Sequence, residues 1–398
     1  MTGSTATRWL WITPAITDHR STGAIVYSLS LAEAVAEQGI DVTCVGLGSS
    51  SVEPASDGLT HVHVEAAPRP GWRRLVSVHP NQASATSVPA FREHLEELLR
   101  ERWDVIVIDG LQTGWVVSDL ARARPCCVVY VAHNHETSMR SQIARSTPWK
   151  SLRRPVLELD AIKTRRLESE LLRRSDVVSS ISAEDLDRFR QQAPQAHHVL
   201  VPPGWSAPAE PRPSVDMADR PRRVGILGSF EWHAKQEGLR RFLAVADPKF
   251  AQADIELVIA GNVPEGFRRT LGDLRATSFL GWVENPADVL ASCRIGAIAE
   301  PLGGGFKLKA LDYVFSDVVV ATLSHSAAGL PFNSGSSMIV AEDELQLADA
   351  IVEAMEDPAL LQKMAIEAHG IADGEFSWSV GARTLIDAVH ARSTPATG

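Results

Sequence analysis

The chain alternates short apolar runs with longer segments in which apolar residues recur every three or four positions. In the first half, the apolar runs predict strands at 9–13, 42–45, 62–65, 105–108, 127–131 and 177–181. The helical spacing predicts helices at 25–38, 89–102, 116–123, 152–174 and 183–191. Strands that alternate with helices indicate parallel βαβ units, so we expect an α/β fold with a doubly wound sheet.

A proline-rich segment interrupts this alternation, which then restarts. Six prolines lie within 202–221, as is typical of a linker. Further strands are predicted at 224–227, 256–260, 278–280, 295–298 and 318–321, and helices at 238–245, 265–274, 286–292, 307–315, 344–356, 358–372 and 380–392. We therefore expect a first α/β domain at 1–203, a linker at 204–221 and a second α/β domain at 222–375. The last helix, at about 376–398, is expected to pack back on the first domain. Parallel sheets bind ligands at the carboxyl ends of their strands, which predicts a cleft between the two domains.

Composition narrows the class of protein. The chain has 398 residues, of which 44% are hydrophobic and 22% charged, which is ordinary for a soluble globular protein. A formal charge of −10 argues against a nucleic-acid partner. We see no secretory signal and no apolar run long enough to span a bilayer. Cys44, Cys126, Cys127 and Cys293 lack metal-ligand spacing, so we expect reduced thiols in a cytoplasmic protein.

The segment 300–313, EPLGGGFKLKALDY, carries the most chemical information. Its three glycines precede a helical pattern, and free backbone N–H groups at a helix start suit a phosphate. Lys307 and Lys309 add positive charge where the helix dipole disfavours it, which indicates a bound anion. Asp312 follows near the same face and could reach a sugar hydroxyl. The alternative interpretation is a glycine-rich turn with two solvated lysines.

Further motifs occur in order along the chain, and together they resemble one family. They are TP at 13–14 with STG at 21–23, VVYVAHNHE at 128–136, VPPG at 201–204, GSFEW at 228–232, LVIAG at 257–261 and FLGWV at 279–283. Over nearly the whole chain they resemble the retaining, metal-independent glycosyltransferases of GT-B fold, family 4. The resemblance implies two doubly wound domains facing each other across a cleft, with the acceptor bound by the domain at 1–203 and the nucleotide sugar by the domain at 222–375. It also implies a nucleoside-diphosphate sugar as donor, UDP or GDP in type, with neither a cofactor nor a metal.

The resemblance also implies roles for particular residues. It assigns catalysis to His133, Lys235 and Lys307, and donor or nucleotide contacts to Gly23, Gly228, Gly261, Gly304, Gly305, Phe306, Lys309 and Asp312. It assigns contact with the acceptor, or shaping of its loop, to Asn134, His135 and Glu136. Lysines and N–H groups aimed at the leaving diphosphate would stabilise the charge that develops there. No protein nucleophile is required, since the leaving phosphate can accept the acceptor's proton.

One motif departs from the family pattern, which is Glu, seven residues, Glu, with a Gly-Phe-Gly core. Asp312 takes the second acidic position, but Gly304 stands at the first and Lys307 replaces a glycine. This variant resembles a subgroup of the family whose motif is Gly-x-Lys-x-Lys-x-x-Glu. Glu300 lies four residues earlier and could compensate only through a loop rearrangement. The missing glutamate motivates a second hypothesis, a non-catalytic partner subunit that binds nucleotide without transfer.

Two other enzyme classes receive less support. A sugar-nucleotide epimerase would need acid and base carboxylates that the matching positions scarcely offer. A nicotinamide-dependent dehydrogenase lacks its Gly-x-Gly-x-x-Gly motif after either domain's first strand.

The segment 140–174 is rich in arginine and lysine. Acidic residues are interspersed, and Glu170 with Arg174 forms an i,i+4 pair, so a solvated helix face is the favoured interpretation. Peripheral contact with an anionic membrane or a phosphorylated lipid is the alternative. The acceptor is expected to offer a hydroxyl, on a glycan, a lipid-linked sugar or a natural product.

Overall fold

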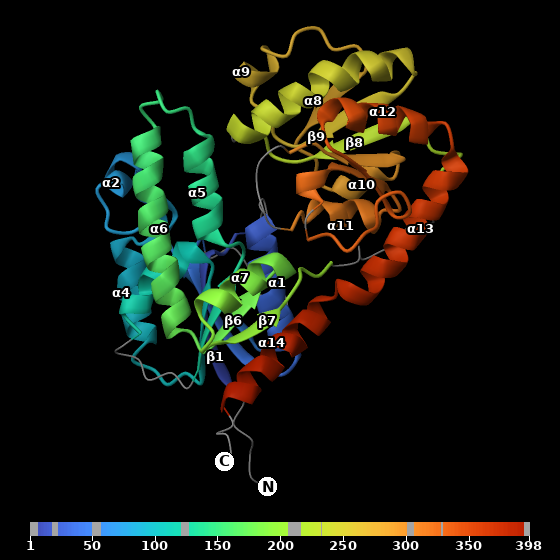
Figure 1. Ribbon diagram of the computed structural model, residues 1–398. Helices are drawn as coiled ribbons and strands as arrows, with labels where there is room; N and C mark the ends of the chain where they lie inside the picture. The colour runs from blue at the N-terminus through green and yellow to red at the C-terminus, as the bar shows by residue number, and fades with distance from the viewer. Residues whose placement is uncertain are drawn as a thin grey trace. The chain divides into compact units, whose positions relative to one another are not determined.

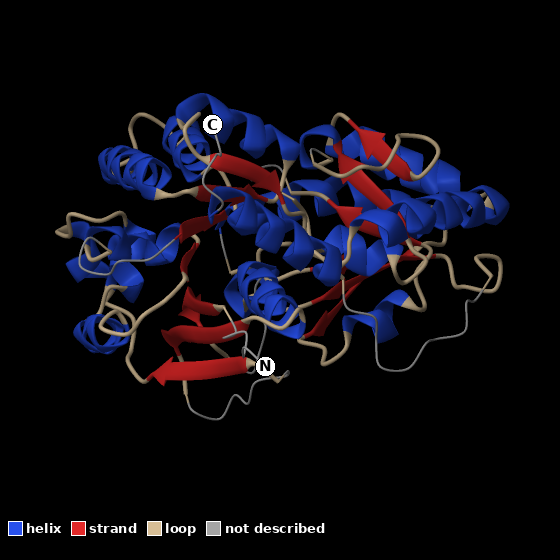
Figure 2. Ribbon diagram, turned by 90° about the horizontal axis from the view of Figure 1, so that it is seen from below, coloured by secondary structure: helices blue, strands red, loops and turns tan. Residues whose placement is uncertain are grey.

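The computed structural model describes residues 7–17, 23–49, 57–120, 127–205, 216–231, 233–300, 306–327 and 329–393. The chain divides into two compact units, one formed by Met1–Gly204 with Ser377–Gly398 and the other by Trp205–Phe376. Each unit contains one parallel sheet with helices on both faces (Figures 1 and 2). The predicted doubly wound α/β architecture is therefore confirmed.

The first unit has a seven-stranded sheet in the order β3-β2-β1-β4-β5-β6-β7. Its strands are β1 (Arg8–Ala15), β2 (Asp41–Leu47), β3 (Leu59–Val64), β4 (Val105–Asp109), β5 (Cys127–Ala132), β6 (Val177–Ser180) and β7 (His197–Leu200). Its helices are α1 (Gly23–Glu37), α2 (Gly71–Leu75), α3 (Asn81–Thr86), α4 (Pro89–Leu98), the 3₁₀ helix η1 (Leu111–Ser118), α5 (Glu136–Ser146), α6 (Arg154–Arg174), α7 (Ala183–Gln192) and α14 (Trp378–Ser393). The strand order reverses between β1 and β4, where open parallel sheets place their ligands.

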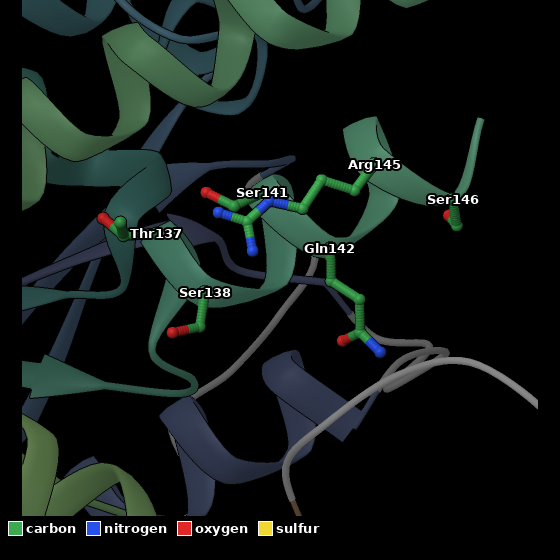
Figure 3. A pocket seen from close by; sticks show the side chains of 6 residues that line it. All are labelled: Thr137, Ser138, Ser141, Gln142, Arg145 and Ser146. Atoms are coloured by element: carbon green, nitrogen blue, oxygen red, sulfur yellow. The ribbon is translucent and has the colours of Figure 1, made fainter. Parts of the chain in front are cut away.

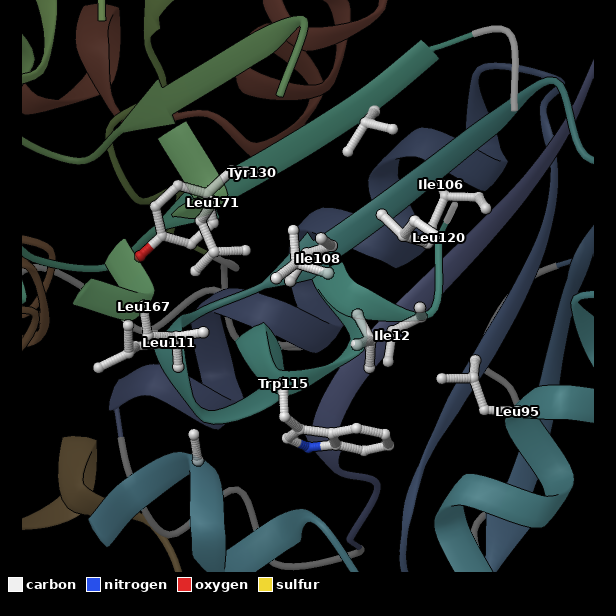
Figure 4. Packing of buried hydrophobic residues seen from close by; sticks show 14 of the residues in the cluster. Ile12, Leu95, Ile106, Ile108, Leu111, Trp115, Leu120, Tyr130, Leu167 and Leu171 are labelled. Atoms are coloured by element: carbon white, nitrogen blue, oxygen red, sulfur yellow. The ribbon is translucent and has the colours of Figure 1, made fainter. Parts of the chain in front are cut away.

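Alternate side chains of β1 enter the cores on opposite faces of this sheet. Leu10 and Ile12 pack in a cluster with Trp115 of η1 and Leu171 of α6 (Figure 4). Trp9 and Trp11 pack on the opposite face of the sheet, in a second cluster that includes residues of α1 and α14. Because successive side chains of a strand point to opposite faces, an apolar run without polar interruptions belongs to a strand buried on both sides.

The last helix packs within the first unit. The ring of Trp378 lies 5.6 Å from the ring of Tyr27, whose hydroxyl donates to the Val201 carbonyl at 2.8 Å. A Cβ at Gly204 would lie 2.4 Å from the backbone nitrogen of Trp378, so only glycine fits this contact. These contacts hold α14 against α1 and the end of the first sheet.

The second unit has a six-stranded sheet in the order β10-β9-β8-β11-β12-β13. Its strands are β8 (Arg223–Leu227), β9 (Glu256–Ala260), β10 (Thr277–Gly281), β11 (Ile295–Ile298), β12 (Val319–Leu323) and β13 (Met338–Ala341). Its helices are α8 (His233–Gln252), α9 (Glu265–Arg268), α10 (Pro286–Leu290), α11 (Lys309–Val314), the 3₁₀ helix η2 (Ser324–Ser326), α12 (Glu344–Met355) and α13 (Pro358–Glu375). Here the order reverses between β8 and β11.

Several elements differ from the sequence prediction. The helix predicted at 116–123 is instead a 3₁₀ helix that begins at Leu111, and 121–126 lie outside the described residues. The helix predicted at 265–274 ends at Arg268, where the Thr270 hydroxyl bonds the Phe267 carbonyl and Gly272 adopts a φ of +76°. Six elements were not predicted: the short helices α2, α3 and η2, the polar helix α5, and the strands β7 and β13.

Among the helices described, none combines the length and the apolar composition needed to cross a membrane.

Candidate functional site

Two glycine turns meet at the carboxyl edge of the second sheet. Gly228 follows β8 and Gly261 follows β9, and the N–H of Gly228 donates to the Ala260 carbonyl at 3.0 Å. Gly261 has a φ of +124°, and a Cβ there would lie 1.9 Å from the Gly228 carbonyl oxygen. Glycine is therefore required at 261, where the two backbones touch, and the side chains of Phe230 and Lys309 lie next to Gly228.

Three lysines converge on one carboxylate beside this edge. Glu300 follows β11, and Lys309 at the start of α11 donates a hydrogen bond to its Oε1. Lys307 Nζ lies 3.8 Å from Oε2, and Lys235 Nζ, on α8, lies 3.9 Å from Oε1. Lys309 also donates to the Leu227 carbonyl, the last of β8, at 3.2 Å. The cluster therefore sits at the reversal point between β8 and β11, and we call these four side chains the lysine cluster.

The side chains of the lysine cluster have shifted pKa values, because they are buried and lie close to one another. Burial alone would raise the pKa of Glu300, but Lys309, Lys307 and Lys235 outweigh it and lower this pKa to about 2. Burial lowers the pKa of Lys307 and of Lys235, and Glu300 partly offsets this effect for both. One carboxylate thus accompanies three ammonium groups, which leaves an excess of positive charge at the edge of the sheet.

The backbone of Glu300 is anchored by the end of the next strand. Its carbonyl accepts a hydrogen bond from the Ser326 hydroxyl at 2.8 Å and lies 2.8 Å from His325 Nε2. Both residues belong to η2, directly after β12. From the sequence, Glu300 was expected to compensate for the missing glutamate of the motif only through a loop rearrangement. In the structure its carboxylate already contacts the lysines.

The remaining residues of the glycine-rich motif fall into three groups. Gly304 and Gly305 lie outside the described residues. The ring of Phe306 lies 5.2 Å from that of Phe376 and packs beside the core of the second unit. Asp312 lies in the first turn of α11, and burial raises its pKa to about 6. No hydrogen bond from a described residue reaches its carboxylate, so that it can accept one from a ligand.

The carboxyl edge of the first sheet carries a second polar cluster. His133 follows β5, and its Nε2 lies 2.6 Å from Oδ1 of Asp109, the last residue of β4. The other oxygen of Asp109 accepts from the Trp11 indole N–H at 2.9 Å. Asp109 is fully buried, and the Tyr27 ring packs edge-on against His133 at 5.4 Å. These contacts fix the orientation of the imidazole.

Sequence reasoning named His133 but missed Asp109. The available signal was a carboxylate that ends the apolar run Val105–Ile108, one strand away from the histidine in the sheet. Gly110 comes next with a φ of +77°, which turns the chain at this edge.

The residues after His133 mostly stabilise the start of α5. His135 caps the helix, with its Nδ1 accepting from the Ser138 N–H at 3.2 Å, and burial lowers its pKa. Burial raises the pKa of Glu136, and the charge of Arg140 at 3.6 Å partly offsets this. Asn134 hydrogen-bonds the Glu136 side chain. Gly23, the remaining predicted donor contact, begins α1 and is exposed.

A hollow of about 540 Å³ lies along the polar face of α5 (Figure 3). Its lining residues are Thr137, Ser138, Ser141, Gln142, Arg145 and Ser146. The Arg145 side chain extends back along the helix toward Ser141. Hydroxyl, amide and guanidinium groups on one face can hydrogen-bond a polar ligand.

Within the described residues, no group of three or more His, Cys, Asp and Glu side chains is arranged to hold a metal ion.

Two family models match the chain in succession. Residues 22–204 match the "Glycosyl transferase 4-like domain" and residues 221–357 match "Glycosyl transferases group 1". The comparison with curated proteins finds no match.

Solved structures share the fold across almost the whole chain. A sucrose-phosphate synthase from Thermosynechococcus elongatus has a TM-score of 0.71 and 17% identity, covering 97% of this chain and 98% of its own. HepE of Anabaena, in complex with UDP and glucose, has a TM-score of 0.68 and 13% identity, with 97% and 100% covered. A protein from E. coli titled "Trehalose-6-phosphate", bound with UDP-2-fluoro glucose, has a TM-score of 0.62 and 12% identity, with 96% and 99% covered.

At these identities the structural likeness shows the fold, and the two family models supply the activity class. The chain belongs to the glycosyltransferases of GT-B fold.

Proposed function

We propose that the chain is a retaining glycosyltransferase that moves a hexose from a nucleoside-diphosphate sugar to a hydroxyl of its acceptor. The observation that carries this proposal is the convergence of Lys235, Lys307 and Lys309 beside the glycine turns at Gly228 and Gly261. Fixed positive charge of this kind stabilises the negative charge that develops on a departing diphosphate. HepE and the E. coli protein bind UDP or UDP-sugar ligands, which makes UDP the first donor base to test.

The described side chains suggest a division of roles. The lysines neutralise the diphosphate, which is why we propose that no divalent ion is needed. Asp312 accepts hydrogen bonds from ribose hydroxyls. His133, oriented by Asp109, contacts the sugar or the β-phosphate during transfer. The leaving phosphate itself accepts the proton of the acceptor hydroxyl, so no carboxylate is assigned as general base. The acceptor is a glycan, a lipid-linked sugar or a natural product, and the reaction takes place in the cytoplasm.

A calorimetric titration with UDP, GDP, ADP and TDP in the presence of EDTA tests the proposal. We expect selective binding of one nucleotide by the wild type. Loss of one charge-assisted contact weakens binding by about ten- to a hundredfold, which we expect for Lys307→Ala. Lys363→Ala removes an exposed lysine of α13 and serves as the matched control, with unchanged affinity. If the wild type binds none of the four nucleotides, the proposal and its site assignments are withdrawn.

A second candidate function rests on Gly304, which stands where the family motif has its first glutamate. In that case the chain binds nucleotide as a non-catalytic partner subunit. Hydrolysis of the sugar nucleotide separates the two candidates, since a transferase slowly uses water as acceptor and a non-catalytic subunit does not. Nucleotide binding without hydrolysis, and without transfer to any acceptor offered, supports the second candidate.

A further inference from the structure

The turn between α5 and α6 has an unusual surface. The two helices lie side by side and are joined at the upper end of the pair in Figure 1. We call residues 145–156, sequence RSTPWKSLRRPV, the α5–α6 tip. Trp149 is 76% exposed and Leu152 is 94% exposed, which is far more than large apolar side chains usually retain.

Apolar exposure continues from the tip along one face of α6. After Leu152, the exposed positions are Val156, Leu159 and Ile162, which follow in steps of four, three and three residues. Residues at this spacing lie on one face of a helix. Close by, Lys163 donates to the Ser77 carbonyl at 2.6 Å, which holds the exposed Val76 and Val78 beside α6.

Positive charge accompanies these apolar side chains. The tip contains Arg145, Lys150, Arg153 and Arg154 and has no acidic residue. Arg154 pairs with Glu158 at 2.7 Å, but no described carboxylate forms an ion pair with any of the other three. Lys150 Nζ lies 5.1 Å from the centre of the Trp149 ring. The chain as a whole carries −10, so the tip is a local exception to its charge.

This combination fits one kind of partner. Exposed aliphatic side chains with a tryptophan insert at the boundary of a bilayer, while lysine and arginine contact anionic headgroups. A symmetric contact with a second copy would bring the same basic residues together and is disfavoured by their repulsion. A nucleic acid would match the charges but would leave the aliphatic face of α6 without a partner. Screening limits the repulsion from acidic residues elsewhere to about 8 Å at physiological salt.

We propose that the α5–α6 tip docks the protein on an anionic lipid surface, with Trp149 and Leu152 inserted and Lys150 and Arg153 on the headgroups. The proposal does not depend on the transfer reaction, because docking needs neither nucleotide nor acceptor. Such docking would present the first unit to acceptors that reside in a membrane.

Co-sedimentation of the full chain with vesicles tests the proposal. One set contains phosphatidylcholine alone and the other contains phosphatidylglycerol in addition. We expect binding to the anionic vesicles only, with weaker binding at high salt. Leu152→Asp is expected to lower the partition coefficient about tenfold or more. Lys150→Gln with Arg153→Gln is expected to lower it about fivefold for each charge.

Matched controls alter the same properties elsewhere on the surface. Ile366→Asp places an acid at an apolar position that is 62% exposed, on α13. Arg190→Gln with Arg269→Gln removes two exposed charges elsewhere on the surface, one on α7 and one directly after α9. Both controls should bind as the wild type does, and all variants should keep its melting temperature.

Three results would overturn the proposal. They are failure of the wild type to bind anionic vesicles, wild-type binding by both tip variants, and a wild-type dimer that Leu152→Asp dissociates without any vesicle binding. The last result would assign the tip to a second copy of the chain. Since the assay contains no sugar nucleotide, none of these results bears on the transferase proposal.

Discussion

At the scale of single residues, neighbouring positive charges lower the pKa of Glu300 strongly. Its carboxylate lies within ion-pair distance of three ammonium groups, and its pKa falls from 4.5 to about 2. A carboxyl group with a lowered folded-state pKa contributes stability above its unfolded pKa and loses that contribution as the pH falls through the folded value. For Glu300 the contribution is about 3 kcal/mol at neutral pH, and it disappears between about pH 4.5 and pH 2.

We expect Glu300→Gln to lower the stability of the free protein and to strengthen nucleotide binding. Without the carboxylate the three ammonium groups lack a counter-charge, and a diphosphate supplies it, which should raise UDP affinity about tenfold. Thermal denaturation at pH 7 should show a lower melting temperature than the wild type without UDP and a larger shift with it.

Glu342→Gln is the matched control, since Glu342 is an exposed carboxylate that follows β13 at the same edge of the sheet. It should alter neither the melting temperature nor the shift. A UDP-induced shift in Glu300→Gln that is equal to or smaller than that of the wild type would mean that the carboxylate does not compete with the ligand.

The sequence suggested the lysines but not their arrangement. Lys307 and Lys309 stood out because cations are disfavoured in the first turn of a helix. Their convergence on Glu300 depends on β12, since His325 and Ser326 hold the Glu300 carbonyl from a position 25 or 26 residues along the chain. Asp109 was not predicted as a site residue, because its partner His133 directly follows the neighbouring strand β5 and lies far from it in the sequence. Contacts between strands are set by sheet order, which local pattern does not contain.

At the scale of elements, the turns after β8 and β9 shape the candidate site. The two backbones touch where Gly261 meets the Gly228 carbonyl, and β11 lies on the other side of β8. Long apolar strands such as β4 and β9 were predicted from their pattern. Strand β7 was not predicted, because it begins with two histidines and none of its residues is buried, so that no apolar run marks it. Strand β13 was missed although its four residues are apolar. Helix α5 was missed because few of its residues are buried, so that it has little apolar periodicity.

We expect Gly261→Ala to destabilise the second unit by about 3 kcal/mol or more and to abolish nucleotide binding. The added Cβ lies 1.9 Å from a carbonyl oxygen, and the φ of +124° is one that alanine rarely adopts. Chemical denaturation and the UDP titration measure the two effects.

The same change at Gly266 separates this clash from a general effect of alanine. Gly266 lies in α9, and a Cβ there meets nothing within 4 Å. Gly266→Ala should leave nucleotide binding unchanged and add up to about 1 kcal/mol of stability. Near-wild-type behaviour of Gly261→Ala would show that the β8 and β9 turns can move apart without loss of the site.

At the scale of the whole molecule, the chain leaves its first unit at Gly204 and returns to it at Ser377. Helix α14 therefore contributes to a core whose other residues lie far earlier in the sequence. Its Ala382, Leu385 and Val389 are almost fully buried in the cluster that contains Trp9 and Trp11. The stability of the first unit thus depends on the last segment of the chain, and that of the second unit does not.

A chain that ends at Phe376 tests this dependence. Loss of α14 exposes apolar side chains worth on the order of 5 kcal/mol, a large part of the stability of a typical domain. We expect amides of β1, β4 and α1 to lose protection from hydrogen exchange, while those of β8 and β9 keep theirs and still gain protection from UDP. A chain that ends at Ser393 retains α14 and should match the full-length protein. Loss of protection in both units would show that they fold as one cooperative body, because removal of a helix from one unit would then unfold the other.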